Sequence, residues 1–192
     1  MTLKKIEDYY HLDVFNGDQL YQIDLGLKEG IDVDIYAKPE YKFEQMYEIR
    51  MGLKEGLDIS FYIDSKLDSN QMYEIRRGLE KGFDVSIYAS DKFIWSQMEQ
   101  IRMGLESGID VSKYAKSNIY TSVMEQIRKG LENGVDISKY TERKLFANQM
   151  EQVRLGLEHN INPDSYAWRK YEWQEMEKMR IDLENGGSSI EL

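Results

Sequence analysis

One pattern of 18 residues recurs along almost the whole chain, and its fixed spacing constrains the fold more than any other feature. The clearest copy is QMEQIRMGLESGIDVSKY at residues 97–114. Seven copies follow one another every 26 residues without insertion or deletion, and they begin at Gln19, Gln45, Gln71, Gln97, Val123, Gln149 and Glu175. A period in this range is typical of stacked arrays, in which each unit buries its apolar face against its neighbours.

The apolar spacing predicts one long helix per copy. Met98, Ile101 and Leu105 are separated by three and four residues, so they share one face of a helix. Gly108 follows the last helical position, and the sixth copy has Asn160 there, the other residue that tolerates a left-handed helix stop. We therefore expect a helix of about 15 to 17 residues in each copy.

A second, short helix is predicted after each stop. Asp110 is a preferred N-cap residue, and the sixth copy has Asn162 followed by Pro163, which the first turn of a helix accepts. Tyr114 and its equivalents in the other copies follow this cap residue at a fixed spacing. The predicted fold class is all-α, an α-solenoid of seven tandem 26-residue repeats, each made of a long helix, a turn and a short helix.

The repeat also defines the expected domain organisation. Residues 1–18 form a degenerate N-terminal cap, because Tyr10 and Phe15 occupy repeat positions one period early. Residues 19–186 form a single repeat domain, and residues 187–192 a flexible tail. The seven units are 19–44, 45–70, 71–96, 97–122, 123–148, 149–174 and the partial 175–186.

Two repeated positions predict contacts between units. A glycine inside each long helix, such as Gly104, costs about 1 kcal/mol relative to alanine, so we expect the backbone of the following unit to approach it closely. The last copy has Asp182 instead. We call Arg50, Arg76, Arg102, Arg128, Arg154 and Arg180 the arginine row. The first copy lacks both this arginine and a preceding cap aspartate, so we expect each arginine to contact the cap aspartate of the preceding unit, for example Arg128 and Asp110.

Composition limits the functions to consider. The chain has no cysteine, which excludes disulfides and thiolate chemistry, and its net charge of −10 disfavours nonspecific binding to nucleic acid. No apolar run approaches the length of a membrane span and no signal peptide opens the sequence, so we expect a cytoplasmic protein. No catalytic, phosphate-binding or metal-binding motif is present, and the two histidines lie far apart. We expect no enzyme activity, no cofactor and no metal.

Candidate binding residues are large side chains at positions that differ between units, because repeat packing does not dictate them. They are Phe43, Tyr47, Ile94, Trp95, Met103, Tyr120, Phe146 and Trp173. We expect Ile94, Trp95, Tyr120 and Phe146 to form one ridge. The competing hypothesis is that these side chains extend the core.

The motifs QMxEIRxGL and GxDVSxY resemble the short tandem helical repeats of uncharacterised bacterial and phage or mobile-element proteins. The resemblance covers about residues 19–186. It implies a helical array without a known activity, and no functional residue is carried over from it. It also suggests an inhibitor of a bacterial defence protein that blocks its target sterically or with an acidic, nucleic-acid-like surface.

The first functional hypothesis is therefore a non-enzymatic protein-binding module. Its partner would be a protein with a basic surface, and the chain would be a monomer or would self-associate through the ends of the array. The alternative is a nucleic-acid-binding solenoid that uses the arginine row and the repeated tyrosines. The competing hypothesis is that the arginine row and the repeated tyrosines only stabilise the fold.

Overall fold

In the computed structural model, residues 5–10 and 13–187 are described, and their regular structure is entirely helical. This confirms the predicted all-α fold class, an α-solenoid of helical repeats. The long helices are α2 (Gly17–Lys28), α3 (Phe43–Lys54), α4 (Ser69–Glu80), α5 (Trp95–Glu106), α6 (Thr121–Glu132), α8 (Ala147–Glu158) and α9 (Trp173–Glu184). The short elements are α1 (Glu7–Tyr10), α7 (Ser138–Thr141) and the 3-10 turns η1 (Val33–Ile35), η2 (Ile59–Phe61), η3 (Val85–Ile87), η4 (Val111–Lys113) and η5 (Pro163–Ser165).

Each long helix spans 12 residues, fewer than the 15 to 17 expected, and in α2 and α4 capping groups fix both ends. At the start of α4, Asp68 accepts a hydrogen bond from the Gln71 backbone N–H (2.9 Å), and the Gln71 side chain accepts one from the Asp68 N–H (2.7 Å). At the other end, Gly82 has a φ of 73°. Asn160 takes the same left-handed conformation with a φ of 61°, which confirms its predicted role as a helix stop.

The short helix is a single turn in each of the first six repeats. The Asp84 carboxylate accepts a hydrogen bond from the Ser86 N–H (3.1 Å), and Asn162 does the same for the Asp164 N–H (3.1 Å), so both predicted N-caps are confirmed. The fifth copy differs, since its short element α7 is an α-helical turn.

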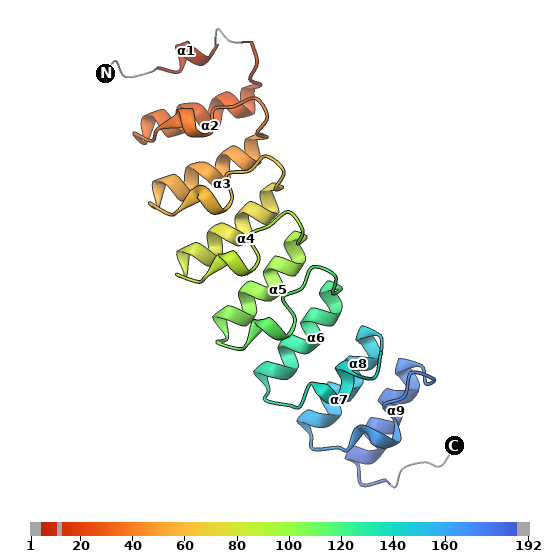
Figure 1. Cartoon of the computed structure of the whole chain (residues 1–192). Helices are drawn as coiled ribbons and strands as arrows, with labels where there is room; N and C mark the ends of the chain where they lie inside the picture. The colour runs from red at the N-terminus through yellow and green to blue at the C-terminus, as the bar shows by residue number, and fades with distance from the viewer. Residues whose placement is uncertain (1–4, 11–12, 188–192) are drawn as a thin grey trace. The chain divides into compact units, whose positions relative to one another are not determined.

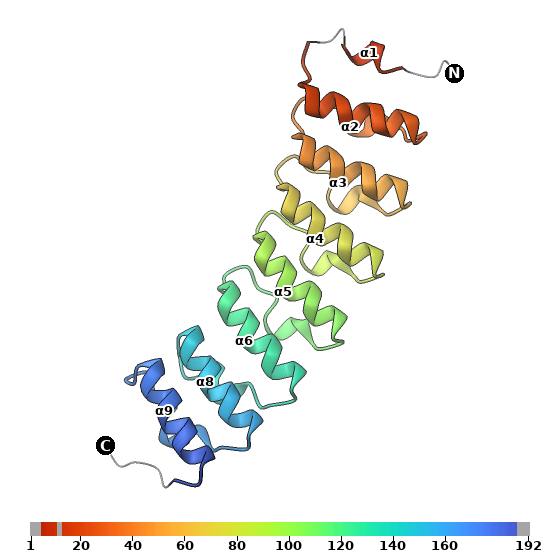
Figure 2. The same cartoon turned by 180° about the vertical axis from the view of Figure 1, so that it is seen from behind.

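The chain divides into two compact units, residues 1–98 and residues 99–192, with the boundary inside α5. In the first unit, α2, α3 and α4 pack in succession, as Figure 1 and the rear view in Figure 2 show. In the second unit, α6, α8 and α9 pack in succession. The repeated Met, Ile and Tyr side chains form the core of each unit, whereas the repeated leucines are only half-buried.

The glycine inside each long helix makes room for a tyrosine of its own repeat. A Cβ atom at Gly104 would lie 1.9 Å from the Tyr114 hydroxyl oxygen, and the equivalent glycines meet their tyrosines in the same way. Our expectation that the backbone of the following unit approaches this glycine was therefore wrong. The last copy has aspartate at this position, and its sequence has leucine where the tyrosine of the other copies would stand ten residues later.

A glutamine joins the start of a long helix to the loop that precedes the next long helix. The Gln45 amide donates to the Leu67 carbonyl (2.6 Å), and the Gln149 amide donates to the Tyr171 carbonyl (2.6 Å). The same side chains close the capping boxes of their own helices. The fifth copy has Val123 at this position and cannot make either bond.

The segment before the first repeat packs through Tyr9. Its buried side chain donates a hydrogen bond to Asp34 (2.7 Å), and its ring centroid lies 6.3 Å from that of Phe15. The side chain of Tyr10, which we expected to fill the repeated tyrosine position, lies outside the described set, and so do residues 188–192 of the proposed tail. Within the described residues, no helix has both the length and the apolar character needed to cross a membrane.

Candidate functional site

The arginine row lies between repeats. Five of its members (Arg50, Arg76, Arg128, Arg154 and Arg180) are buried, and the Nε of each donates to a Gln or Glu side chain of the preceding long helix at 2.7–3.2 Å. The Arg128 guanidinium, for example, donates to the Gln100 side chain (3.0 Å) and to Glu132 of its own helix (2.7 Å). The Asp110 carboxylate instead accepts a hydrogen bond from the Ser112 backbone N–H. The prediction that an arginine contacts the preceding unit is confirmed for these pairs, but the predicted cap-aspartate partner was wrong.

The repeated tyrosines are equally inaccessible. Tyr36, Tyr62, Tyr88, Tyr114, Tyr140 and Tyr166 are fully buried, and each hydroxyl donates to a carbonyl of its own repeat's long helix at 3.0–3.4 Å. Burial raises the pKa of the Tyr36 and Tyr140 phenols, which keeps them neutral hydrogen-bond donors. These rings cannot stack on a base supplied from solution without unpacking the core.

The first unit instead exposes a different aromatic set, which we call the aromatic face: Tyr21, Phe43, Tyr47 and Tyr73. Their exposed fractions are 59%, 39%, 40% and 41%. The three tyrosines occupy one repeat position on the successive helices α2, α3 and α4. In the last four copies this position is Glu, so the aromatic row belongs to the first unit alone.

A shallow pocket of 410 Å³ opens in this face, lined in part by Phe43, Tyr47 and Tyr73. The carboxylates of Glu44 and Glu48 also line it. Glu48 is buried and accepts a hydrogen bond from Arg76 Nε (2.7 Å). Burial raises the pKa of Glu48, although the Arg76 guanidinium opposes this shift. The pocket thus combines aromatic rings with acidic oxygens.

Each tyrosine of the pocket also covers a buried cation. The Arg50 guanidinium lies 5.6 Å from the Tyr47 ring centroid, and that of Arg76 lies 5.7 Å from the Tyr73 centroid. Such contacts hold a ring in place with one face occupied and the other toward solvent. The rings are therefore positioned before any partner arrives.

The other candidate residues are distributed over both units. In the first unit Ile94 and Trp95 are exposed. In the second, Tyr120 (82% exposed) and Phe146 (60%) are the N-cap residues of α6 and α8, which pack together, and Met103 and Trp173 are half-buried. The exposed members are accordingly not extensions of the core.

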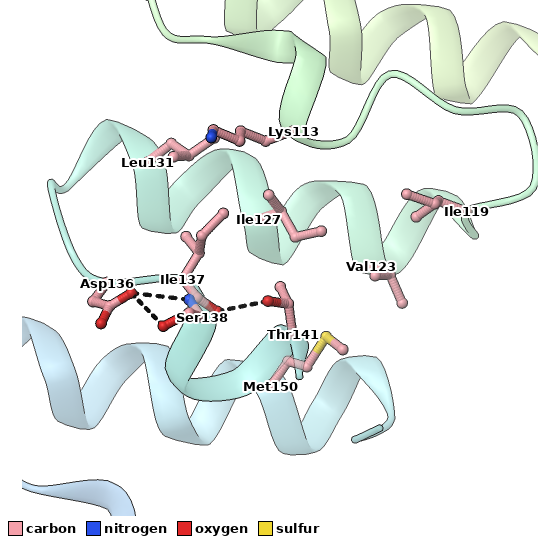
Figure 3. A pocket seen from close by; sticks show the side chains of 10 residues that line it. All are labelled: Lys113, Ile119, Val123, Ile127, Leu131, Asp136, Ile137, Ser138, Thr141 and Met150. Carbon is pink, nitrogen blue, oxygen red and sulfur yellow. Dashed lines mark hydrogen bonds between the residues drawn. The ribbon is translucent and has the colours of Figure 1, made fainter. Parts of the chain in front are cut away.

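The second unit contains a further apolar pocket of 540 Å³ along α6 (Figure 3). Ile119, Val123, Ile127 and Met150 contribute apolar side chains to it, and Lys113 lies at its rim. Its polar groups already bond to one another: Asp136 accepts from Ser138, and the Thr141 hydroxyl donates to the Ile137 carbonyl (3.0 Å). The pocket forms where two repeat positions change, since Lys113 replaces the Ile or Phe of the first unit and Val123 replaces glutamine.

Comparisons with known proteins find no matching family model, no similar curated protein and no similar solved structure. Any functional conclusion therefore depends on the residues of this chain.

No catalytic constellation accompanies these surfaces in the described residues. His159 is exposed, with Nδ1 2.8 Å from a Glu184 carboxylate oxygen, which is a surface pair, and His11 lies outside the described residues. No cluster of three or more potential metal ligands occurs among the residues described.

Sequence reasoning missed Tyr21, Tyr73 and Trp168, all of which are exposed. The signal for the two tyrosines was available in the change from Tyr to Glu at one repeat position after the third copy. Trp168 follows the last short helix, where the other repeats have Lys, Asp, Ser or Glu.

Proposed function

We propose that the chain is a non-enzymatic protein-binding scaffold whose aromatic face contacts a partner protein with a basic surface. The observation that carries this proposal is the row of three exposed tyrosines with Phe43, which no repeat packing requires. Aromatic residues are enriched in the buried centres of protein interfaces, where they dominate the binding energy.

Charge supports the choice of partner. Residues 1–98 include 19 of the 35 acidic side chains and 12 of the 25 basic ones, so the first unit is the more acidic. Glu44 and Glu48 line the same pocket as the aromatic rings. Aromatic rings and carboxylates together favour a Lys or Arg side chain of the partner, and an acidic surface speeds encounter with a basic one.

Burial of five of the six arginines in the row, and of all six repeated tyrosines, removes most of the contacts on which binding to nucleic acid was to depend, so we do not propose that activity. We keep the cytoplasm as the proposed location. The resemblance to repeats of phage and mobile-element proteins makes a bacterial defence protein the partner class to test first, with blocking of its surface as the proposed action.

The test is affinity capture from a bacterial lysate with quantitative mass spectrometry, followed by affinity measurement with the purified partner. Replacing Phe43, Tyr47 and Tyr73 with alanine should weaken binding at least about tenfold, because truncating an interface anchor costs about 2 kcal/mol or more. Ile87→Ala, an exposed apolar position on η3 of the same unit, is the matched control and should bind normally.

A second variant, Trp95→Ala with Tyr120→Ala, tests the remaining exposed candidates and should also bind at least about tenfold more weakly. Helical content and melting should stay near those of the wild type. Equal capture by all variants, or capture of nuclease-sensitive nucleic acid in place of a protein, would reject the proposal.

A further inference from the structure

The second unit exposes a group of cations and aromatic rings that contrasts with the acidic chain. We call Lys144, Phe146, Trp168, Arg169 and Lys170 the basic-aromatic cluster. Phe146 and Trp168 are 60% and 52% exposed, and the three cations are exposed as well. The residues come from two loops one period apart, which precede α8 and α9.

Contacts that the loop before α9 makes with Gln149 and Phe146 hold these two loops together. The Gln149 amide at the start of α8 donates to the Tyr171 carbonyl (2.6 Å) and, at 3.4 Å, to the Arg169 carbonyl. The Arg169 guanidinium lies 4.9 Å from the Phe146 ring centroid, so a cation of one loop covers a ring of the other.

Arg143 and Arg169 occupy the same repeat position but have different surroundings. The Arg143 guanidinium donates to Asp164 (2.5 Å) and to the Ala167 carbonyl (3.2 Å), and it lowers the pKa of Asp164. Arg143 therefore joins two repeats and neutralises the Asp164 carboxylate. Among the described residues, Arg169 forms no ion pair, and its charge is available to a ligand.

The tryptophan is also held in place. Trp168 Nε1 donates to the Asp164 carbonyl (2.9 Å), and the Arg143 guanidinium lies 5.8 Å from its ring. Lys144 and Lys170 likewise form no ion pair within the described part of the chain, and Lys170 Nζ lies 4.7 Å from the Tyr171 ring centroid. Fixed rings beside unpaired cations suit a ligand that has both negative charge and apolar surface.

We infer that the basic-aromatic cluster is a second binding site, which takes a short acidic peptide segment with interspersed apolar side chains. Charge complementarity decides the class of ligand, since three unpaired cations flank two exposed rings. Glu142 and Glu172 bracket the cluster in sequence, and the whole chain has a net charge of −10. A long polyanion such as nucleic acid would also meet the negative charge of the rest of the chain, whereas a short acidic segment needs to contact only the cations of the cluster.

This site is separate in residues and in ligand charge from the aromatic face of the first unit, so each can be tested without the other. The probe is a fluorescein-labelled peptide of about eight residues that alternates Glu with Leu and spans about 26 Å when extended. Binding to the full chain is measured by fluorescence anisotropy at about 50 and about 300 mM salt. The control peptide has Gln in place of each Glu.

We expect the Glu peptide to bind at least about tenfold more tightly than the Gln peptide at low salt, and Arg169→Glu with Lys170→Glu to remove this difference. Phe146→Ala should weaken binding without changing its salt dependence. The matched control is Lys116→Glu with Lys178→Glu, which changes the net charge equally at exposed lysines elsewhere in the second unit and should bind normally. Alanine variants of Phe43 and Tyr47 should also bind normally, and circular dichroism establishes that each variant folds.

Three outcomes would overturn the inference. One is equal binding of the Glu and Gln peptides, and another is equal loss of binding in the matched control, which would indicate a general charge effect. The third is tighter binding of single-stranded oligothymidylate of about the same length, which would assign the cluster to nucleic acid.

Discussion

The contact between Gly104 and Tyr114 can be tested by adding a single methyl group. In Gly104→Ala the new Cβ would lie 1.9 Å from the Tyr114 hydroxyl oxygen and 2.9 Å from Val111 Cγ1. The Tyr114 ring is fully buried and its hydroxyl donates to the Gln100 carbonyl (3.0 Å), so moving it strains the core and breaks that bond. Overpacking a core destabilises a protein by about 1–3 kcal/mol, and a buried polar group left without a hydrogen bond by about 1–3 kcal/mol. The higher helix propensity of alanine relative to glycine stabilises the helix by about 1 kcal/mol. We expect a net loss of about 2 to 4 kcal/mol, and a larger loss for Gly104→Leu.

The assay is urea denaturation followed by circular dichroism, in a double-mutant cycle with Tyr114→Phe. Without the hydroxyl, the nearest ring atom, Cζ, would lie 3.2 Å from the new Cβ, which the ring relieves by a small shift. The cost of Gly104→Ala should therefore fall by about 2 kcal/mol in the Phe background. Asp182→Ala is the control, because no tyrosine follows it, and it should be neutral or slightly stabilising. A rise in stability for Gly104→Ala, or additive effects in the cycle, would refute the argument.

Three further substitutions test other contacts by urea denaturation. Val123→Gln restores the missing glutamine bond to the loop before the next long helix and should raise the free energy of unfolding by about 1 kcal/mol; an unchanged value would mean that this bond contributes nothing. Asn160→Gly relieves a left-handed conformation and should add about 0.5–1 kcal/mol, and a loss would contradict this. Burial raises the pKa of Glu48 above its usual 4.5, so the folded state holds the Glu48 proton more strongly than the unfolded state does. The stability of the wild type relative to Glu48→Gln should therefore fall as pH rises from about 4.5 through the raised pKa. A stability difference that grows in favour of the wild type would show instead that the pairing with Arg76 dominates.

The repeat and its helix ends could be predicted because they depend on local chemistry. Asn160, Asn162 and Pro163 stand at the predicted helix stop and helix start because each residue type favours one backbone conformation. The helix length was overestimated because apolar spacing does not show where the capping box begins. That boundary depends on a glutamine, such as Gln71, which also bonds the loop before the next long helix.

The partner of the arginine row could not be read from residue types. Its acceptors are Gln100 in one repeat and Glu48 in another, so no single residue type marks the position, whereas the cap aspartate is nearly constant. The contact joins residues 28 positions apart, and its geometry depends on how two long helices pack. The sequence therefore predicted which repeat the arginine contacts but not which side chain accepts its hydrogen bond.

Exposure of the candidate site residues depends on the same packing. Tyr41 and Phe43 are two positions apart and both aromatic, yet Tyr41 is buried and Phe43 lies on the surface. The difference arises because Tyr41 precedes the helix and its carbonyl accepts a hydrogen bond from Gln19 of the preceding long helix (2.6 Å), while Phe43 starts the helix on its outer side. Variation between repeats identified most of the exposed residues, but only the arrangement of helices separates them from the core.

The last described long helix differs from the earlier ones at three repeat positions. At the positions where earlier repeats place the bridging glutamine, the acceptor of the arginine and the helix glycine, α9 has Glu175, Lys178 and Asp182. Stacking another copy on these positions would bury charges without the amide partners that Gln149 and Gln152 supply between α8 and α9. Each unpaired buried charge costs several kcal/mol, so this face of α9 disfavours self-association through the end of the array. Neither the aromatic face nor the basic-aromatic cluster includes Glu175, Lys178 or Asp182, so both proposed contacts can form without this face of α9.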